Sequence, residues 1–98
     1  MLQLLKVHGH SLYPQVRDGD YVVVAKRFFR SGKIKVGDLI VFHQPGYGRL
    51  IKRVQRVLDD GKAYDVRGTQ IESTDSRDFG PIACQAVSGK VIWHIRQR

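Results

Sequence analysis

Ser11 is the residue whose surroundings best suit covalent chemistry. It stands in the stretch Gly9-His10-Ser11-Leu12-Tyr13-Pro14, between two segments of β-strand composition. A glycine before it and a proline turn after it place its hydroxyl where a substrate could reach it. Because a serine hydroxyl attacks only when a neighbouring base removes its proton, a nucleophilic Ser11 requires a base and a group that orients that base.

The elements that must position this serine are β-strands. Several segments are rich in β-branched and aromatic residues and are separated by turn residues such as glycine and aspartate. These predicted strands cover residues 2–7, 21–25, 39–42, 49–58, 63–67 and 87–95. Two Gly-Asp turns each lead into an apolar strand, and helix signals are nearly absent. We therefore predict a mainly β fold, a small coiled, barrel-like domain.

Three connections between these strands have distinct compositions. Residues 26–35 are basic and irregular, which indicates a loop or a short helical turn. Asp59-Asp60-Gly61-Lys62 carries the Asp-Gly signature of a hairpin turn. Residues 68–81 are polar and rich in turn formers, so we expect a long surface segment, a feature that usually has a functional reason.

Lys52 lies in the middle of the predicted strand 49–58. Because side chains alternate across a strand, Leu50, Lys52 and Val54 share one face. Arg53 should point to the other side, whereas Arg56 is two residues further along the face of Val54. The alternation thus places a lysine between two apolar side chains.

Length and composition limit the number of domains and the cellular compartments that suit this chain. The 98 residues favour a single domain, residues 1–98, with one modest core. Cys84 is the only cysteine, which excludes an internal disulfide and favours a reducing compartment. No stretch reaches the roughly 20 apolar residues of a membrane-spanning helix, and the first residues do not form a signal peptide. We expect a cytoplasmic protein, with membrane association left open.

Charge and aromatic residues keep a different class of function open. The net charge of +8 is consistent with an acidic partner, and Phe28-Phe29 lies among basic residues. A basic β domain without catalysis, binding nucleic acid or an acidic protein, is the alternative. His8, His10, His43 and His94 have no carboxylate or cysteine at ligand spacing, so we expect no metal and no cofactor.

The order of short motifs along the chain resembles the signal peptidase I family and its LexA-like relatives. The most specific piece is the Ser-x-Asp-Ser-Arg-x-Phe-Gly stretch, and the resemblance extends over almost the whole chain. The matching pieces are Gly9-x-Ser11-Leu12-x-Pro14, Gly19-Asp20, Gly37-Asp38-Leu39-Ile40-Val41-Phe42, Ile51-Lys52-Arg53-Val54, Gly68, Ser73-Thr74-Asp75-Ser76-Arg77-Asp78-Phe79-Gly80-Pro81 and Gly89-Lys90-Val91.

The resemblance implies a serine endopeptidase that uses a Ser-Lys dyad. Ser11 matches the nucleophile of the family and Lys52 its general base. A free lysine has a pKa of about 10.4, so Lys52 could accept a proton near neutral pH only if apolar surroundings lower that value by several units. On this hypothesis Leu50 and Val54 supply those surroundings.

The resemblance also assigns supporting roles. Ser73 matches a serine that holds the lysine amine towards the nucleophile, and Asp75 and Arg77 match residues that brace the loop carrying it. The backbone N–H of Ser11 is the expected oxyanion donor. Gly9 lacks a hydroxyl, so a second donor must come from the backbone or from elsewhere. The predicted walls of the substrate cleft, where an extended peptide pairs with an open strand edge, are Tyr21, Val22, Val23, Leu39 and Val41.

Departures from the family pattern narrow the expected substrate. Leu12 replaces the usual methionine, and Thr69-Gln70 replaces Asp-Asn after Gly68. No anchor and no large extra β domain are expected, which favours the short members that trim a leader, such as those proposed for precursors of nickel-type superoxide dismutase. A LexA-type self-cleavage module is an alternative. The expected partner is a precursor protein, without an obligate nucleic acid; peripheral membrane contact and oligomeric state stay open.

Overall fold

The computed structural model describes residues 2–9, 12, 14–26, 34–68 and 74–97. They form one antiparallel sheet of seven strands in the order β1-β2-β7-β3-β4-β5-β6. The strands are β1 (Leu2–Lys6), β2 (Tyr21–Lys26), β3 (Leu39–Gln44), β4 (Gly48–Leu58), β5 (Ala63–Arg67), β6 (Ile82–Ala83) and β7 (Val87–Ile95). The short helix α1 (Ser76–Phe79) and two 3-10 turns (Asp59–Gly61 and Cys84–Ala86) complete the described structure. The predicted mainly β fold is confirmed.

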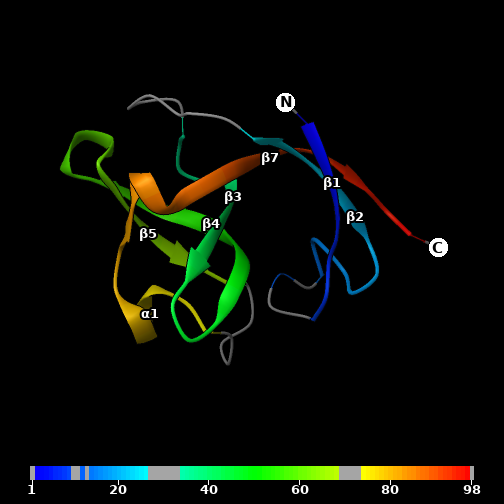
Figure 1. Cartoon of the computed structure of the whole chain (residues 1–98), viewed down its shortest axis with the longest axis horizontal. Helices are drawn as coiled ribbons and strands as arrows, with labels where there is room; N and C mark the ends of the chain where they lie inside the picture. Colours follow the sequence, from blue (N-terminus) through cyan, green and yellow to red (C-terminus); the bar gives the residue numbers. More distant parts are fainter. Residues whose placement is uncertain (1, 10–11, 13, 27–33, 69–73, 98) are drawn as a thin grey trace.

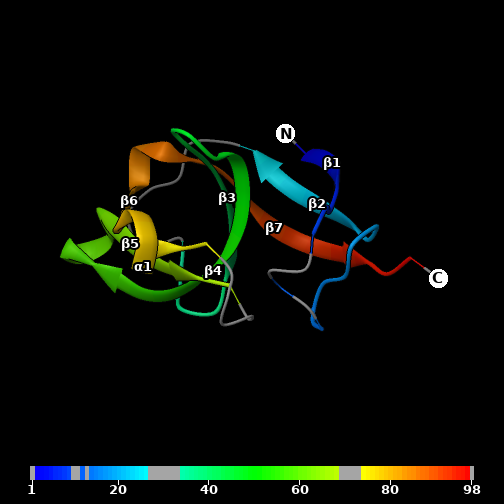
Figure 2. The same ribbon diagram turned by 90° about the horizontal axis from the view of Figure 1, so that it is seen from below.

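β7 joins the two halves of the sheet. Its C-terminal part pairs with β2, whereas residues Val87 to Lys90 pair with β3. Figure 1 shows β3, β4, β5 and α1 on one side of the molecule and β1, β2 and both termini on the other, with β7 running across. Figure 2 shows the same division from below. β7 approaches β2 closely at Gly89. A Cβ added at this glycine would collide with the Val24 side chain, so no larger residue fits there.

The core consists of two clusters of buried side chains, and β3 contributes to both. Its apolar run Leu39 to Phe42 is buried throughout, which is typical of a strand covered on both faces. Ile40 and Phe42 point into the first cluster and Leu39 and Val41 into the second, following the alternation of a strand. The first cluster is Ile34, Ile40, Phe42, Val54, Tyr64, Val66, Ile82 and Val87. The second is Val7, Leu12, Val16, Val22, Val24, Leu39 and Val41.

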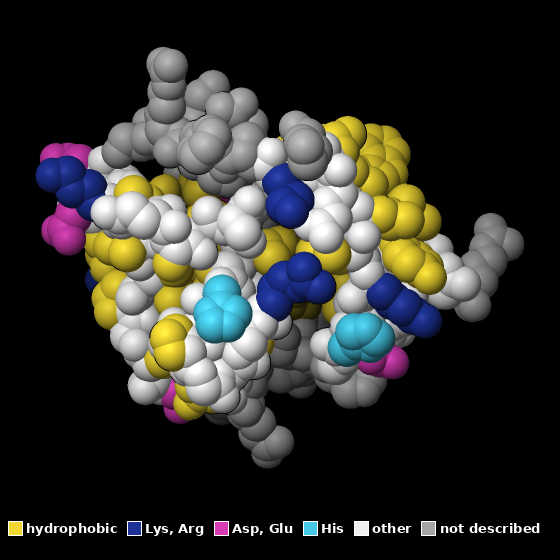
Figure 3. All heavy atoms as spheres, in the orientation of Figure 1, with side chains coloured by type: hydrophobic (Ala, Val, Ile, Leu, Met, Phe, Trp, Pro, Cys, Tyr) yellow, Lys and Arg dark blue, Asp and Glu magenta, His cyan; other side chains and the backbone are white. Residues whose placement is uncertain are grey.

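The outer face of β1, β2 and β7 is apolar. Leu4 lies opposite Val23, and Val23 lies opposite Trp93, so the three side chains form a row across the sheet. Leu4 and Trp93 are exposed, as are Leu2 and Ile95 nearby. Figure 3 shows hydrophobic atoms gathered over this half of the molecule. Of the described residues, no helix has the length and apolar character needed to cross a membrane.

Candidate active site

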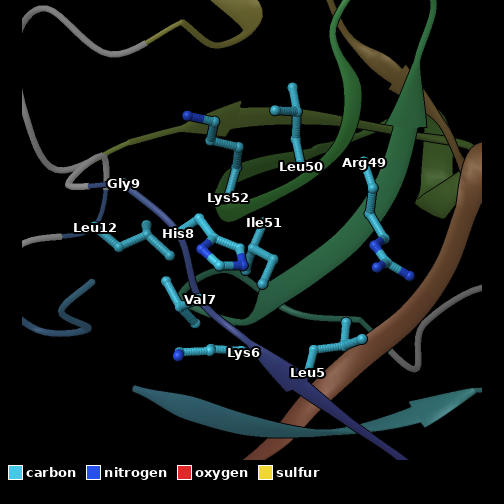
Figure 4. Close-up of a pocket in the computed structure, with 10 residues that line it drawn as sticks. All are labelled: Leu5, Lys6, Val7, His8, Gly9, Leu12, Arg49, Leu50, Ile51 and Lys52. Atoms are coloured by element: carbon cyan, nitrogen blue, oxygen red, sulfur yellow. The ribbon is translucent and has the colours of Figure 1, made fainter. Parts of the chain in front are cut away.

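A cavity of about 280 Å³ opens between the segment that follows β1 and the first half of β4. Two of its lining residues, Gly9 and Leu12, flank position 11 in the sequence, and a third is Lys52. Figure 4 shows the lining side chains, with His8 and Ile51 near the centre. The full lining is Leu5, Lys6, Val7, His8, Gly9, Leu12, Arg49, Leu50, Ile51 and Lys52.

One wall of the cavity is the open edge of β1. This strand stands at the end of the sheet order and pairs only with β2 among the described strands. The Val7 N–H donates to the Asp20 carbonyl (2.7 Å), and the Val7 carbonyl accepts from the Gly19 N–H (2.8 Å). Because alternate residues of a strand direct their main-chain groups to opposite edges, those of Lys6 and His8 point away from β2.

The opposite wall is a free stretch of the β4 edge. The Val54 N–H donates to the Asp38 carbonyl (2.8 Å), and the Val54 carbonyl accepts from the Gly37 N–H (2.9 Å), so Val54 faces the β3 side. By the same alternation the main-chain groups of Arg49 and Ile51 face the other side. β5 covers that side only from Arg53 onward. Between the described strands, the cavity therefore separates two β edges that lack a partner.

Lys52 is buried, as the strand alternation predicted. Its side chain is only 3% exposed, and Val54 on the same face is fully buried in the first core cluster, with half-buried Leu50 packed against it. Ile51 packs against the second cluster, which confirms the alternation. A bulge follows Val54, and it leaves Arg56 exposed and paired with Asp65 at 3.3 Å.

Burial lowers the pKa of the Lys52 amine below its ordinary value of 10.5. The cause is desolvation, which disfavours the charged form of an amine. The Asp75 carboxylate acts in the opposite direction and raises the pKa, whereas the Arg77 guanidinium lowers it. The Asp78 carboxylate also raises the pKa, but desolvation by burial is the largest cause and decides the direction.

Asp75 is the most constrained charged residue near Lys52. It is fully buried, and its carboxylate accepts from Gly68 N–H (3.1 Å) and from the N–H, Nε and Nη2 of Arg77 (3.0, 2.9 and 2.8 Å). Burial alone would raise the Asp75 pKa, but the hydrogen bonds from Arg77 and Gly68 outweigh it and lower the pKa to about 2. The carboxylate is therefore ionised throughout the physiological range.

The hydrogen bonds of Asp75 and Ser76 fix the start of α1 against β5. Asp75 is the N-cap of this helix, and Asp78 accepts from the Asp75 N–H (3.1 Å), which completes a capping box. The Ser76 hydroxyl accepts from the Val66 N–H (2.9 Å). The expectation of a surface segment over residues 68–81 is wrong at Asp75, which is fully buried. Its carboxylate is held inside by the capping and ion-pair hydrogen bonds.

Gly9 shapes the turn that leads towards position 11. Its φ of +90° is a conformation that residues with a Cβ rarely adopt. Its N–H donates to the Asp18 carboxylate at 2.7 Å. That N–H already has a hydrogen-bond partner. Gly9 therefore contributes to the site through its backbone conformation, which directs the chain towards position 11.

Asp20 holds the far end of the same turn against the C-terminal strand. Its carboxylate is 1% exposed; it accepts from the N–H of Arg17 (3.0 Å) and of Gln97 (2.9 Å) and lies 2.7 Å from His94 Nε2. The N–H groups of Arg17 and Gln97, followed by His94, lower the Asp20 pKa to about 2. This clamp ties the segment after the turn to the end of β7.

The Asp20 clamp predicts a specific loss of stability in acid. A carboxyl whose pKa is lower in the folded than in the unfolded state stabilises the fold above its unfolded pKa, here 3.8, and that stabilisation disappears as the pH falls towards about 2. Asp20→Asn should therefore be less stable than the parent at pH 7 but lose less stability between pH 4 and pH 2, as urea unfolding would show. Asp75 titrates in the same range, so part of the slope should persist. An unchanged slope in Asp20→Asn would contradict the clamp.

The other predicted site residues do not line this cavity among the residues that the structure describes. Ser11 and Ser73 lie outside the described residues. Tyr21 and Val23 are half-buried on the outer face of β2. The remaining predicted cleft residues belong to the second core cluster and are not among the residues that line this cavity, because strand alternation turns their side chains inward; they are Val22, Leu39 and Val41.

Sequence reasoning missed several lining residues of the cavity. Lys6 and His8 immediately precede Gly9, and Arg49 and Ile51 immediately precede Lys52 on its strand. The available signal was their closeness in sequence to the two predicted catalytic positions. Two strands that converge on the predicted catalytic positions also bring the residues just before those positions to the same cavity.

A small β domain with a buried lysine at a cavity between two open strand edges is the kind of site that binds an extended peptide. Residues 1–60 match the family described as signal peptidase, peptidase S26, which is more than half of the chain. The chain belongs to this family and is a protease of the signal-peptidase type. A search of curated proteins gave no match.

Proposed function

We propose that this protein is a serine endopeptidase in which Ser11 is the nucleophile and Lys52 the general base, and that it removes a leader or pro-segment from a precursor protein. The observation that carries the proposal is the position of Lys52. Its amine is buried, its pKa is lowered, and it lines the same cavity as Gly9 and Leu12, which lie two residues before and one residue after Ser11 in the sequence. Membership of the peptidase family supports the same reading.

The substrate would bind as an added strand. Lys6 and His8 on one wall and Arg49 and Ile51 on the other direct main-chain groups into the cavity. An extended peptide placed between them could form hydrogen bonds with both walls, so that affinity comes from its main chain. Such binding also explains why both edges lack a strand partner in the described structure.

The chemistry requires the neutral form of Lys52. The Lys52 amine takes the proton of the Ser11 hydroxyl while the Ser11 oxygen attacks the scissile carbonyl carbon. The tetrahedral intermediate collapses when the C–N bond breaks and the Lys52 ammonium gives its proton to the leaving amine. Water then attacks the acyl-enzyme, Lys52 accepts a proton from the water, and that proton returns to the serine oxygen as the acid product leaves.

Asp75 and Arg77 would act as positioning residues. Asp75 pairs with Arg77 at 2.8 Å and accepts from the Gly68 N–H just after β5, so it ties the start of α1 to the end of β5. Ser73 lies two residues before Asp75 in the sequence, and we propose that this brace sets the place from which Ser73 orients the amine. The proposal is consistent with the general need of a catalytic pair for a supporting shell.

The narrower substrate proposal is the leader of a nickel-type superoxide dismutase precursor. It rests on the resemblance to short family members. Its test is incubation of the purified protein with that precursor and with unrelated precursors of equal leader length. Cleavage of all of them at similar rates would remove this substrate while keeping the peptidase.

The dyad is tested by paired substitutions. Ser11→Ala and Lys52→Ala should each reduce precursor cleavage, followed by mass spectrometry, by about 10⁴-fold or more, as the loss of a catalytic group typically does. Ser88→Ala and Lys62→Ala are matched controls, because both residues are exposed and lie outside the cavity. Full cleavage by either dyad variant would refute the proposal. Salt-sensitive oligonucleotide binding without cleavage would favour the non-catalytic alternative.

A further inference from the structure

The ionisable side chains that line the cavity are all basic. They are Lys6, His8, Arg49 and Lys52, and the lining contains no aspartate or glutamate. Among the described residues no carboxylate lies within ion-pair distance of Lys6 or Arg49. Since burial disfavours the charged form of Lys52, the permanent positive charge of the cavity comes from Lys6 and Arg49.

These two cations stand on the two walls between which a peptide would lie. Lys6 belongs to β1 and Arg49 to β4. Arg49 precedes Lys52 by three residues on the same strand, which is about 10 Å at the usual rise of a strand. Figure 4 shows the Arg49 side chain on the other side of Leu50 from Lys52.

We propose that the site selects peptides with an acidic side chain about three residues from the scissile bond, where Arg49 would bind it. This inference rests on the proposed function, because the bond is counted from the Ser11 and Lys52 end. An added strand has nearly the same rise per residue as β4, so a side chain three residues away reaches the level of Arg49. A guanidinium binds a carboxylate through two parallel hydrogen bonds, and no internal carboxylate of the described chain competes for it.

The cleavage test uses synthetic alanine-rich peptides in which one residue is Glu, Gln or Lys, moved stepwise along the sequence. At low salt the wild type should cleave the best Glu peptide with a kcat/KM about tenfold above its Gln counterpart, the effect of one charged hydrogen bond. The preference should shrink as salt screens it. Arg49→Glu should invert the preference in favour of Lys, whereas Lys62→Glu, an equal placement of negative charge outside the cavity, should keep it.

A binding test separates this inference from the proposed function. Fluorescence anisotropy with the Ser11→Ala variant measures the affinity for the same Glu, Gln and Lys peptides without cleavage. Cleavage without any Glu preference, or a Glu preference that survives Arg49→Glu, overturns the inference and leaves the peptidase intact. A Glu preference in binding with no cleavage by the wild type supports the charge selection and overturns the dyad. Equal binding of the three peptides refutes the charge selection.

Discussion

Replacing Lys52 by methionine is expected to abolish peptide cleavage while making the folded domain more stable at neutral pH. Methionine fills a similar volume without an amine, so the base is lost and kcat/KM should fall by about 10⁴-fold or more. The fold gains because a buried amine is costly to the native state. Replacing a buried ion pair by apolar residues is often stabilising by about 1–4 kcal/mol, and the single amine of Lys52 should give a gain at the lower end of that range. Urea unfolding and a peptide assay measure the two effects.

The pH dependence of this gain has a definite sign. Burial lowers the Lys52 pKa below 10.5, so between the folded and unfolded pKa values the unfolded chain binds a proton that the folded chain does not. The stability of the wild type therefore rises with pH through that window, and the advantage of Lys52→Met should shrink as the pH approaches 10.5. Lys62→Met, at an exposed position, is the control. A methionine variant that is less stable at every pH would contradict the burial cost.

Asp75 substitutions should separate bracing from electrostatics. Asp75→Ala removes the helix cap, the ion pair with Arg77 and the acceptor of the Gly68 N–H, and it should cost about 2–3 kcal/mol of unfolding free energy. This cost is at or below the range of about 3–5 kcal/mol for breaking a buried ion pair, because the Arg77 side chain is itself 39% exposed. Asp75→Asn can still cap the helix and should cost less. Equal losses in both variants would assign the effect to charge alone.

The same pair predicts opposite shifts of the pH–rate profile. The Asp75 carboxylate raises the Lys52 pKa and the Arg77 guanidinium lowers it. Asp75→Asn should therefore move the acid limb of kcat/KM to lower pH, and Arg77→Gln should move it to higher pH, because that limb reports the base of the free enzyme. A purely structural role would reduce the rate without moving the limb. Identical shifts in the two variants would contradict the assignment of Lys52 as base.

Most of the strands can be predicted from local patterns in the sequence. The apolar run of β3 and the alternation around Lys52 in β4 depend on neighbouring residues, and both are confirmed. The short β6 pairs with β5 through only two residue pairs, Ala63 with Ala83 and Tyr64 with Ile82, so its sequence carries too little pattern to predict a strand. The double role of β7, which pairs with β2 and β3, depends on contacts between distant segments.

The candidate site is only partly readable from sequence for the same reason. The burial of Lys52 followed from the apolar residues on either side of it on one face. The burial of Asp75 could not be read from its polar neighbourhood, because it depends on hydrogen bonds with Gly68 and Arg77. Strand composition likewise cannot tell a cleft wall from a core strand, and the predicted cleft residues Val22, Leu39 and Val41 are buried in the second core cluster.

The most direct test of the account is the titration of the Lys52 amine by NMR, in protein labelled with ¹³C at the lysine ε-carbons. The Lys52→Met variant identifies the signal. We predict one lysine signal that titrates below the ordinary value of 10.5, is missing in Lys52→Met, and moves further down in Asp75→Asn. A Lys52 signal that titrates at the ordinary value of 10.5 would contradict the account, because a fully charged amine cannot take the proton of Ser11.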